Sequence, residues 1–161
     1  MTNLRLNKLL YFAQGNSLAR TGKRLFNDVV QAWQLGPVVP VAYDRYSVCG
    51  SGPISESAPN SEEFPDDVVD LLIDVMRYYG RYTTSTLVDM THRPDTPWAR
   101  YYISGIKRDI PVSEIRNSFS RGGAEWVSSI NDPSDPFSKI PIYTPSRDEQ
   151  GVAILPRELF D

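Results

Sequence analysis

The sequence predicts a mainly helical, compact domain with a small β-hairpin insertion, followed by an irregular carboxyl-terminal extension; by strict count the class is α+β. Three observations predict this. Apolar residues recur at helical spacing in several segments, one segment after the first helix contains extended pieces around a turn, and the pattern fades after residue 120. We therefore divide the 161-residue chain into a domain, residues 3–120, and an extension, residues 121–161, that packs on the domain or extends from it.

The first predicted helix covers residues 4–21. Gly15 interrupts it, which costs about 1 kcal/mol relative to alanine, and Gly22 suits a left-handed cap at its end. Since the apolar stripe begins almost at the first residue, we expect this helix to pack on segments far along the chain. The stripe consists of Leu6, Leu9, Leu10 and Ala13.

Residues 24–37 predict the hairpin. Short extended pieces lie on either side of a turn at Asn27-Asp28. We expect Gly36-Pro37 to end the hairpin, because proline cannot donate a hydrogen bond to a strand ladder. Pro40 then suits the first turn of a helix over residues 40–46, where its missing N–H costs nothing.

Four further helices are predicted after a long loop at residues 47–65. The clearest covers residues 66–80, where Asp66 and Asp67 occupy the first turn and favour the helix dipole. Its apolar stripe is wide, which indicates burial of more than half its circumference. The remaining helices are expected near residues 83–92, 97–102 and 111–119, and a short strand at residues 140–143.

Composition narrows the class of protein. Hydrophobic residues make up 40% and charged residues 23%, which is typical of a globular domain. No apolar run approaches the roughly 20 residues of a membrane span, and the start lacks the layout of a secretory signal. The single cysteine, Cys49, excludes an internal disulfide, so we expect a cytoplasmic protein without membrane association.

Catalysis has little support in the sequence. A zinc site needs several cysteine or histidine ligands, and the chain has only Cys49 and His92. A nucleophilic dyad of these two is conceivable, but Cys49 lies in a Gly/Ser loop without a helix start directly after it to lower its pKa. We expect His92 to be a capping or hydrogen-bonded residue, and the protein to have no enzymatic activity, cofactor or metal.

The charges suggest partners of two kinds. Residues 46–76 hold seven acidic residues and no basic one; this stretch is either a solvated helix face or a patch that attracts a basic protein. Near the amino end, basic residues lie close together, which keeps a DNA-binding regulator as an alternative, although the acidic whole makes nucleic acid the weaker expectation. These basic residues are Arg5, Lys8, Arg20, Lys23 and Arg24.

Aromatic residues, at 11%, exceed what one small core hides completely. Tryptophan and tyrosine are favoured anchors of protein interfaces, although each is also common in cores. We expect the outer face of the hairpin, with residues 41–65, to form part of a partner-binding surface. The candidate contact residues, including two from the acidic stretch, are Trp33, Tyr43, Tyr46, Asp66, Asp70 and Trp98.

Two blocks of sequence resemble the SocA-like antitoxin family, also called the Panacea domain and related to phage-associated GepA-like proteins. The first block runs from the Lys-Leu-Leu-Tyr of the first helix to a Pro-x-x-Tyr helix start, and the second is the Leu…Thr-His…Pro-Trp pattern. The resemblance covers about residues 3–120. Its motif residues include Lys8, Tyr11, Gly36, Pro37, Pro40, Leu87, Thr91, His92, Pro97 and Trp98.

The resemblance implies a mostly helical fold and the antitoxin half of a toxin–antitoxin pair, which neutralises its cognate toxin protein by direct contact. Some family members are thought to hand the toxin to a protease instead, and a phage-associated interaction protein is a further alternative. Family members usually carry another helix before the Leu-Leu-Tyr helix. Either the start of this chain is shortened, or a second copy supplies that packing in a homo-oligomer.

Overall fold

The computed structural model describes residues 1–55, 64–130, 146–147 and 153–154. It confirms the mainly helical fold class with a small antiparallel sheet. Among the described residues, none of the helices is both long and apolar enough to cross a bilayer. The elements are α1 (Asn3–Thr21), β1 (Gln31–Trp33), β2 (Gly36–Val38), α2 (Pro40–Arg45), η1 (Ser47–Cys49), α3 (Asp66–Tyr79), α4 (Thr84–Thr91), α5 (Pro97–Tyr101), β3 (Arg108–Asp109), α6 (Val112–Ile130), β4 (Ser146–Arg147) and β5 (Ala153–Ile154).

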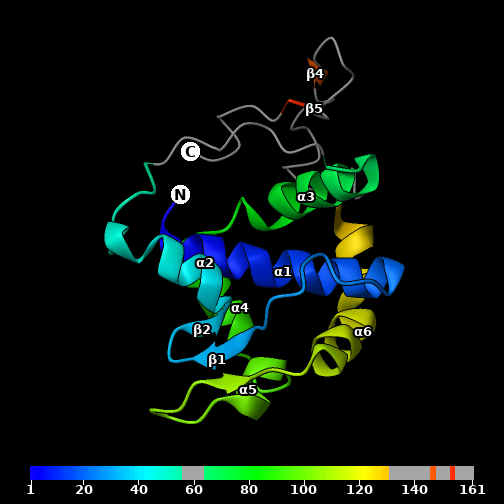
Figure 1. Ribbon diagram of the computed structural model, residues 1–161. Helices are drawn as coiled ribbons and strands as arrows, with labels where there is room; N and C mark the ends of the chain where they lie inside the picture. Colours follow the sequence, from blue (N-terminus) through cyan, green and yellow to red (C-terminus); the bar gives the residue numbers. More distant parts are fainter. Residues whose placement is uncertain (56–63, 131–145, 148–152, 155–161) are drawn as a thin grey trace.

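Helix α1 is the centre of the domain. Figure 1 shows it crossing the middle of the molecule, with α3 above it and the β1–β2 hairpin and α5 below it. It packs on α6, α3 and α4, which confirms that the first helix needs partners far along the chain. Thr2 caps its start, and Gly22, at φ 71°, caps its end, which confirms the cap predicted at Gly22.

The burial of α1 is wider than its apolar stripe. Tyr11, Phe12 and Leu18 are buried besides the predicted Leu9 and Ala13. The Phe12 ring stacks on Tyr79 of α3 with centroids 4.0 Å apart. A helix that packs on several neighbours buries more than one of its faces. The single apolar stripe read from the sequence therefore underestimates the contacts of α1.

Gly15 has a packing reason to interrupt α1. A Cβ atom built at Gly15 would overlap the ring of Phe119 on α6. The same ring lies edge-on to Tyr11, with centroids 5.4 Å apart. The glycine therefore lets α6 approach α1 closely, and this contact offsets the propensity that glycine loses in a helix.

The three-stranded sheet has the order β2-β1-β3, and both pairings are antiparallel. The hairpin turn lies at Gln34-Leu35, so the expected turn at Asn27-Asp28 is wrong. Instead, residues 25–26 bind to α1: the Gln14 side chain accepts from the Leu25 N–H at 2.7 Å and donates to the Phe26 carbonyl at 2.8 Å. A buried glutamine here takes the place of a partner strand.

Gly36-Pro37 does not end the hairpin but lies inside β2, which corrects a second expectation. Pro37 pairs with Ala32 of β1. Antiparallel ladders alternate between hydrogen-bonded and non-bonded pairs, and this position is non-bonded, so β1 needs no N–H from it. Pro40 does begin α2, as the sequence predicts.

The later helices follow the sequence closely. Asp66 and Asp67 occupy the first turn of α3, Thr83 caps α4 and Pro97 opens α5. Helix α6, however, continues to Ile130, so the expectation of irregular chain directly after residue 120 is wrong for 121–130. A helix already formed propagates through weak helix formers at about 1 kcal/mol per glycine. The division at residue 120 stays a prediction, and the strand expected at residues 140–143 lies outside the described residues.

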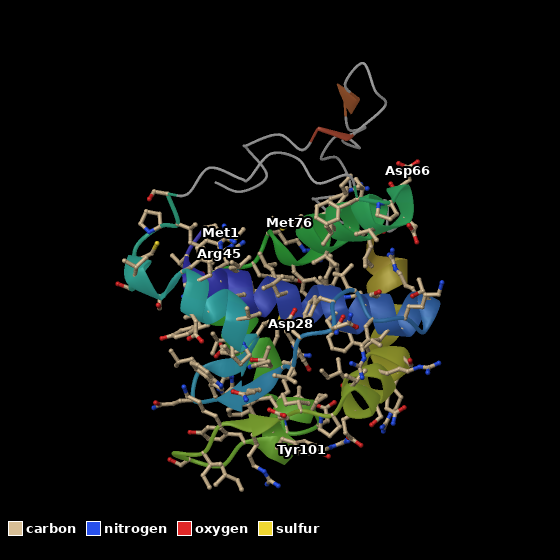
Figure 2. The ribbon with its side chains drawn as sticks, in the orientation of Figure 1. Met1, Asp28, Arg45, Asp66, Met76 and Tyr101 are labelled. Atoms are coloured by element: carbon tan, nitrogen blue, oxygen red, sulfur yellow. The ribbon has the colours of Figure 1, made fainter. Side chains whose placement is uncertain are left out.

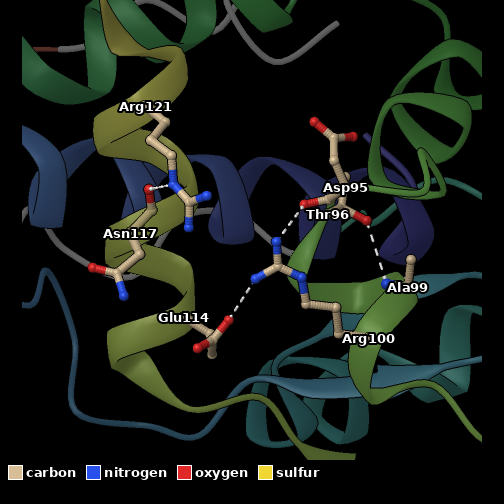
Figure 3. A network of polar contacts seen from close by, with 7 residues as sticks. All are labelled: Asp95, Thr96, Ala99, Arg100, Glu114, Asn117 and Arg121. Carbon is tan, nitrogen blue, oxygen red and sulfur yellow. Dashed lines mark hydrogen bonds and ion pairs between the residues drawn. The ribbon is translucent and has the colours of Figure 1, made fainter.

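A polar network joins α5 to α6 (Figure 3). Thr96 caps α5 by accepting from the Ala99 N–H at 3.3 Å. Arg100 Nη1 lies 2.8 Å from Glu114 Oε2, across the segment that carries β3. Since both side chains are partly exposed, the pair adds little free energy, but it fixes the two ends of the β3 segment relative to each other.

Candidate protein-binding site

The residues of both motif blocks meet around β2. Lys8 Nζ on α1 donates to the Pro37 carbonyl at 2.8 Å, and Asn7 Oδ1 accepts from the Val39 N–H at 2.9 Å. In the alternating ladder, the Pro37 carbonyl and the Val39 N–H both point away from β1. Two side chains of α1 therefore close the outer edge of β2.

Gly36 makes this approach possible. Its φ of 101° lies in the region that favours glycine. A Cβ atom at Gly36 would lie 2.7 Å from both Lys8 Cε and Thr91 Oγ1. Two features therefore require glycine at this position: its backbone conformation and the space that the Lys8 side chain occupies.

Lys8 is buried without a carboxylate partner among the residues that the structure describes. Its side chain is 0% exposed, and the Pro37 carbonyl is its hydrogen-bond acceptor. Burial lowers the pKa of Lys8 to about 7, because a charged amine loses its hydration there. Burial of a lysine amine costs free energy. We interpret this burial as a sign that the position of the hairpin is tightly specified.

The second motif block holds the turn of the hairpin. His92 Nδ1 lies 2.7 Å from the Val88 carbonyl, and Nε2 lies 3.2 Å from the carbonyl of Gln34 in the turn. Trp98 Nε1 donates to the Trp33 carbonyl at 2.7 Å, and its ring lies 3.7 Å from that of His92. These contacts give His92 a structural role.

The proposed dyad finds no support in these contacts. The atoms recorded around the imidazole of His92, within the described part of the chain, belong to α4, the hairpin turn and α5, and Cys49 is not among them. Cys49 lies in η1, after α2. A nucleophile and its base need hydrogen-bond reach.

The opposite side of the hairpin displays four aromatic or aliphatic side chains and one lysine, which together we call the hairpin surface: Trp33, Leu35, Tyr43, Ile106 and Lys107. Trp33 and Tyr43 meet edge to face with centroids 4.8 Å apart, and Lys107 Nζ lies 3.7 Å from the Trp33 ring. Leu35, Tyr43 and Ile106 are 55%, 37% and 53% exposed. Figure 1 shows α2, the hairpin turn and the loop before β3 along one side of the domain.

The structure brings together only some of the predicted contact residues. Trp33 and Tyr43 touch, and Tyr46 follows at the end of α2, where Arg45 lies 5.6 Å from its ring. Trp98 is only 8% exposed and donates to the Trp33 carbonyl, which favours a structural role over a partner contact.

The two acidic candidates lie elsewhere on the molecule. Asp66 and Asp70 are exposed residues in the amino-terminal half of α3. Figure 2 shows Asp66 and Arg45 on opposite sides of the domain. An acidic partner-binding patch would therefore be separate from the hairpin surface.

Sequence reasoning missed Leu35, Ile106 and Lys107. Leu35 lies within the predicted hairpin but not among the predicted contact residues, and nothing in the local pattern indicates that residues 106–109 return to β1. One signal in the sequence could have indicated this return. Ile103 and Ile106 flank the turn-forming pair Ser104-Gly105 and show no helical periodicity.

The basic cluster expected near the amino end is largely used inside the domain. Lys8 is buried, and Arg5 donates to the Tyr82 and Gly80 carbonyls at 2.7 and 2.6 Å. Arg20 pairs with Asp74 at 2.8 Å. This weakens the electrostatic case for nucleic-acid binding, which needs several basic residues facing one backbone.

Fold and site together define a small helical domain that anchors a β-hairpin and displays its aromatic outer side. The chain belongs to the SocA-like antitoxin family, Panacea domain, whose family model matches residues 6–99. A curated relative, Antitoxin SocA of Caulobacter vibrioides (strain NA1000 / CB15N), is 34% identical over 113 residues, which cover 61% of this chain and 58% of that protein. The chain thus matches little more than half the length of this relative. No solved structure matches the chain.

Proposed function

We propose that the protein is an antitoxin that neutralises a partner toxin protein by direct binding through the hairpin surface. Family membership and the name of the Caulobacter relative support the antitoxin role. The observation that carries the binding mode is the contact between half-buried Trp33 and exposed Tyr43, together with the exposed Leu35 and Ile106. Aromatic side chains in such a setting are the usual energetic centre of a protein interface.

The anchoring of the hairpin supports the same proposal. Lys8 and Asn7 hold β2 from one side, and Trp98 holds the carbonyl of Trp33. A surface already fixed in its bound shape loses little conformational entropy when a partner docks. The buried motif residues thus prepare the displayed ones for binding.

The first test identifies the partner. The products of reading frames that adjoin this gene are expressed alone and together with this protein. We expect one of them to arrest growth alone, to be harmless in the pair, and to co-purify with this protein in a fixed ratio. If none of the neighbouring products is toxic or binds, the proposal fails.

The second test places the interface. Alanine at Tyr43, and separately at Tyr46, is expected to weaken binding of that toxin, with Tyr43→Ala losing roughly 2 kcal/mol, or about thirty-fold in Kd. Phe64→Ala is the control, because Phe64 is also an exposed aromatic (53%) but lies next to α3. Unchanged affinity in both tyrosine variants would remove the hairpin surface from the proposal.

Direct neutralisation and delivery to a protease predict different results in a purified system. If binding itself neutralises, the toxin loses activity on mixing with this protein, without any protease. If the protein is a proteolytic adaptor, the purified mixture stays toxic and activity falls only when a protease and ATP are added. We expect the first result, because the exposed apolar side chains are suited to covering a partner surface.

A further inference from the structure

The two edges of the sheet differ in how their main-chain groups are used. The Ile110 N–H donates to the Val30 carbonyl at 2.8 Å, and Arg108 lies opposite Ala32. Because hydrogen-bonded and non-bonded pairs alternate, Arg108 and Ile110 direct their main-chain groups toward β1. Lys107 and Asp109 then direct theirs to the outer edge of β3.

The edge formed by β2 is closed, whereas the edge formed by β3 is open. At β2, the outward carbonyl of Pro37 and N–H of Val39 bind Lys8 and Asn7. At β3, within residues 1–55 and 64–130, no hydrogen bond reaches the outward groups of Lys107 and Asp109. An unpaired edge of this kind is a template for another strand.

The side chains around the open edge keep it in a defined position. Gln31 Nε2 donates to Asp109 Oδ1 at 2.9 Å, and Lys107 Nζ lies over the Trp33 ring. The ion pair between Arg100 and Glu114 joins the helices on either side of this segment. The free edge is therefore part of a fixed sheet and lies directly beside the hairpin surface.

We propose that an extended segment of the partner protein pairs with the free edge of β3 and adds a fourth strand to the sheet. Its main chain would bond to the outward N–H and C=O groups of Lys107 and Asp109, and its side chains would lie alternately on the face that carries Trp33 and on the face that carries Ile106. This inference rests on the proposed function, since it specifies how the toxin is held. Strand addition of this type draws affinity from main-chain bonds and specificity from alternate side chains.

A second copy of this chain is a poor occupant of the edge. When two identical strands pair antiparallel about a two-fold axis through their outward residues, one residue lies opposite its own copy. The registers centred on Lys107 and on Asp109 place like charges face to face, which is destabilising. The register centred on Arg108 places two arginines opposite each other, although it also pairs Lys107 with Asp109. Since every register contains a like-charge contact, the toxin is the better occupant.

The charges of the edge indicate the chemistry of that segment. Lys107 and Arg108 are exposed and basic, while the Asp109 carboxylate already accepts from Gln31. An extended segment with an acidic residue opposite Arg108 and an apolar residue toward Ile106 fits both features. We therefore expect the toxin to contribute an acidic, partly apolar strand.

The test compares two variants of one residue. Asp109→Pro removes the outward N–H and the carboxylate, whereas Asp109→Ala removes only the carboxylate, so their difference measures the N–H. The probe is the purified toxin from the adjoining reading frame, made inactive by substitution. We expect Asp109→Pro to bind about ten-fold more weakly than Asp109→Ala. Equal affinities of the two folded variants overturn strand addition and leave the antitoxin function intact, whereas failure of the unsubstituted protein to bind overturns both.

A second measurement covers the case in which the proline variant does not fold. Amide exchange is followed by NMR on the unsubstituted protein, with and without the toxin. We expect the Lys107 and Asp109 amides to exchange rapidly in the free protein and at least about ten-fold more slowly in the complex, because they acquire acceptors. If the complex forms and these two amides exchange as before, the edge is not paired and the inference is wrong.

Discussion

Replacing Lys8 with methionine tests whether the hairpin is anchored by a buried amine. Methionine has a similar length and keeps the apolar packing, but it cannot donate to the Pro37 carbonyl. At a single pH the result is ambiguous, since the loss of this hydrogen bond destabilises while removal of a buried polar group stabilises. The dependence of stability on pH separates these effects.

The magnitude follows from the pKa of Lys8, which burial lowers from 10.5 to about 7. Between these values the unfolded chain binds the proton and the folded chain does not, so the free energy of unfolding rises with pH. With 1.36 kcal/mol per pKa unit, the rise from pH 7 to pH 9 is about 2 kcal/mol. This stability is lost as the pH falls back to 7, and below the folded pKa the contribution is constant.

Urea unfolding at pH 7, 8 and 9 measures the effect in the unsubstituted protein and in Lys8→Met. We expect only the former to gain about 2 kcal/mol, with Lys23→Met, at an exposed lysine, as the control for loss of one charge. The series stops at pH 9 because burial raises the pKa values of Tyr11 and Tyr79, whose unfolded forms ionise near pH 10. Parallel pH profiles for the protein and Lys8→Met would refute the buried-amine anchor.

Three further substitutions test the packing of the domain by urea unfolding. Gly15→Ala should destabilise by about 1–3 kcal/mol through overlap with Phe119, and Phe119→Leu in the same chain should recover part of the loss; an additive double variant would contradict the contact. Gly36→Ala should cost at least about 2 kcal/mol, because its positive φ and the nearby Lys8 both exclude a Cβ atom; a neutral effect would contradict this geometry. Arg108→Pro should destabilise by about 1–3 kcal/mol, because it removes an N–H that points to β1. Asp109→Pro, in contrast, should leave stability near that of Asp109→Ala. Equal losses for both proline variants would contradict the register of β3.

The helices could be predicted from the sequence because their signals are local. The stripe and first-turn aspartates of α3, the Thr83 cap of α4 and Pro97 of α5 all act within one or two turns. The rule that proline is excluded from ladders failed at Pro37 because its validity depends on the register. That register follows from the two-residue turn at Gln34-Leu35, which makes Ala32 and Pro37 a non-bonded pair. The pairing of β1 with β3, more than seventy positions later, is contained in no local pattern.

The residues of the candidate site also differ in whether local sequence signals could predict them. Trp33 and Tyr43 could be chosen from residue type alone, since exposed aromatics are frequent interface anchors. Trp98 has the same residue type but is buried, and its role follows from a hydrogen bond to the Trp33 carbonyl, 65 positions away. Lys107 enters the site only because β3 pairs with β1 and brings the amine over the Trp33 ring.

The buried motif residues explain why family membership does not by itself specify a partner. Lys8, Gly36 and His92 belong to the motifs by which the family is recognised, and each holds the hairpin from the inside. Leu35 and Ile106 lie outside those motifs and are exposed on the other side. Substitution of a buried residue that anchors the hairpin alters the position of the hairpin. Substitution of an exposed residue on the hairpin surface alters only the contacts with a partner. Partner choice within such a domain can therefore vary through the displayed residues and the free edge of β3, while the anchored framework stays the same.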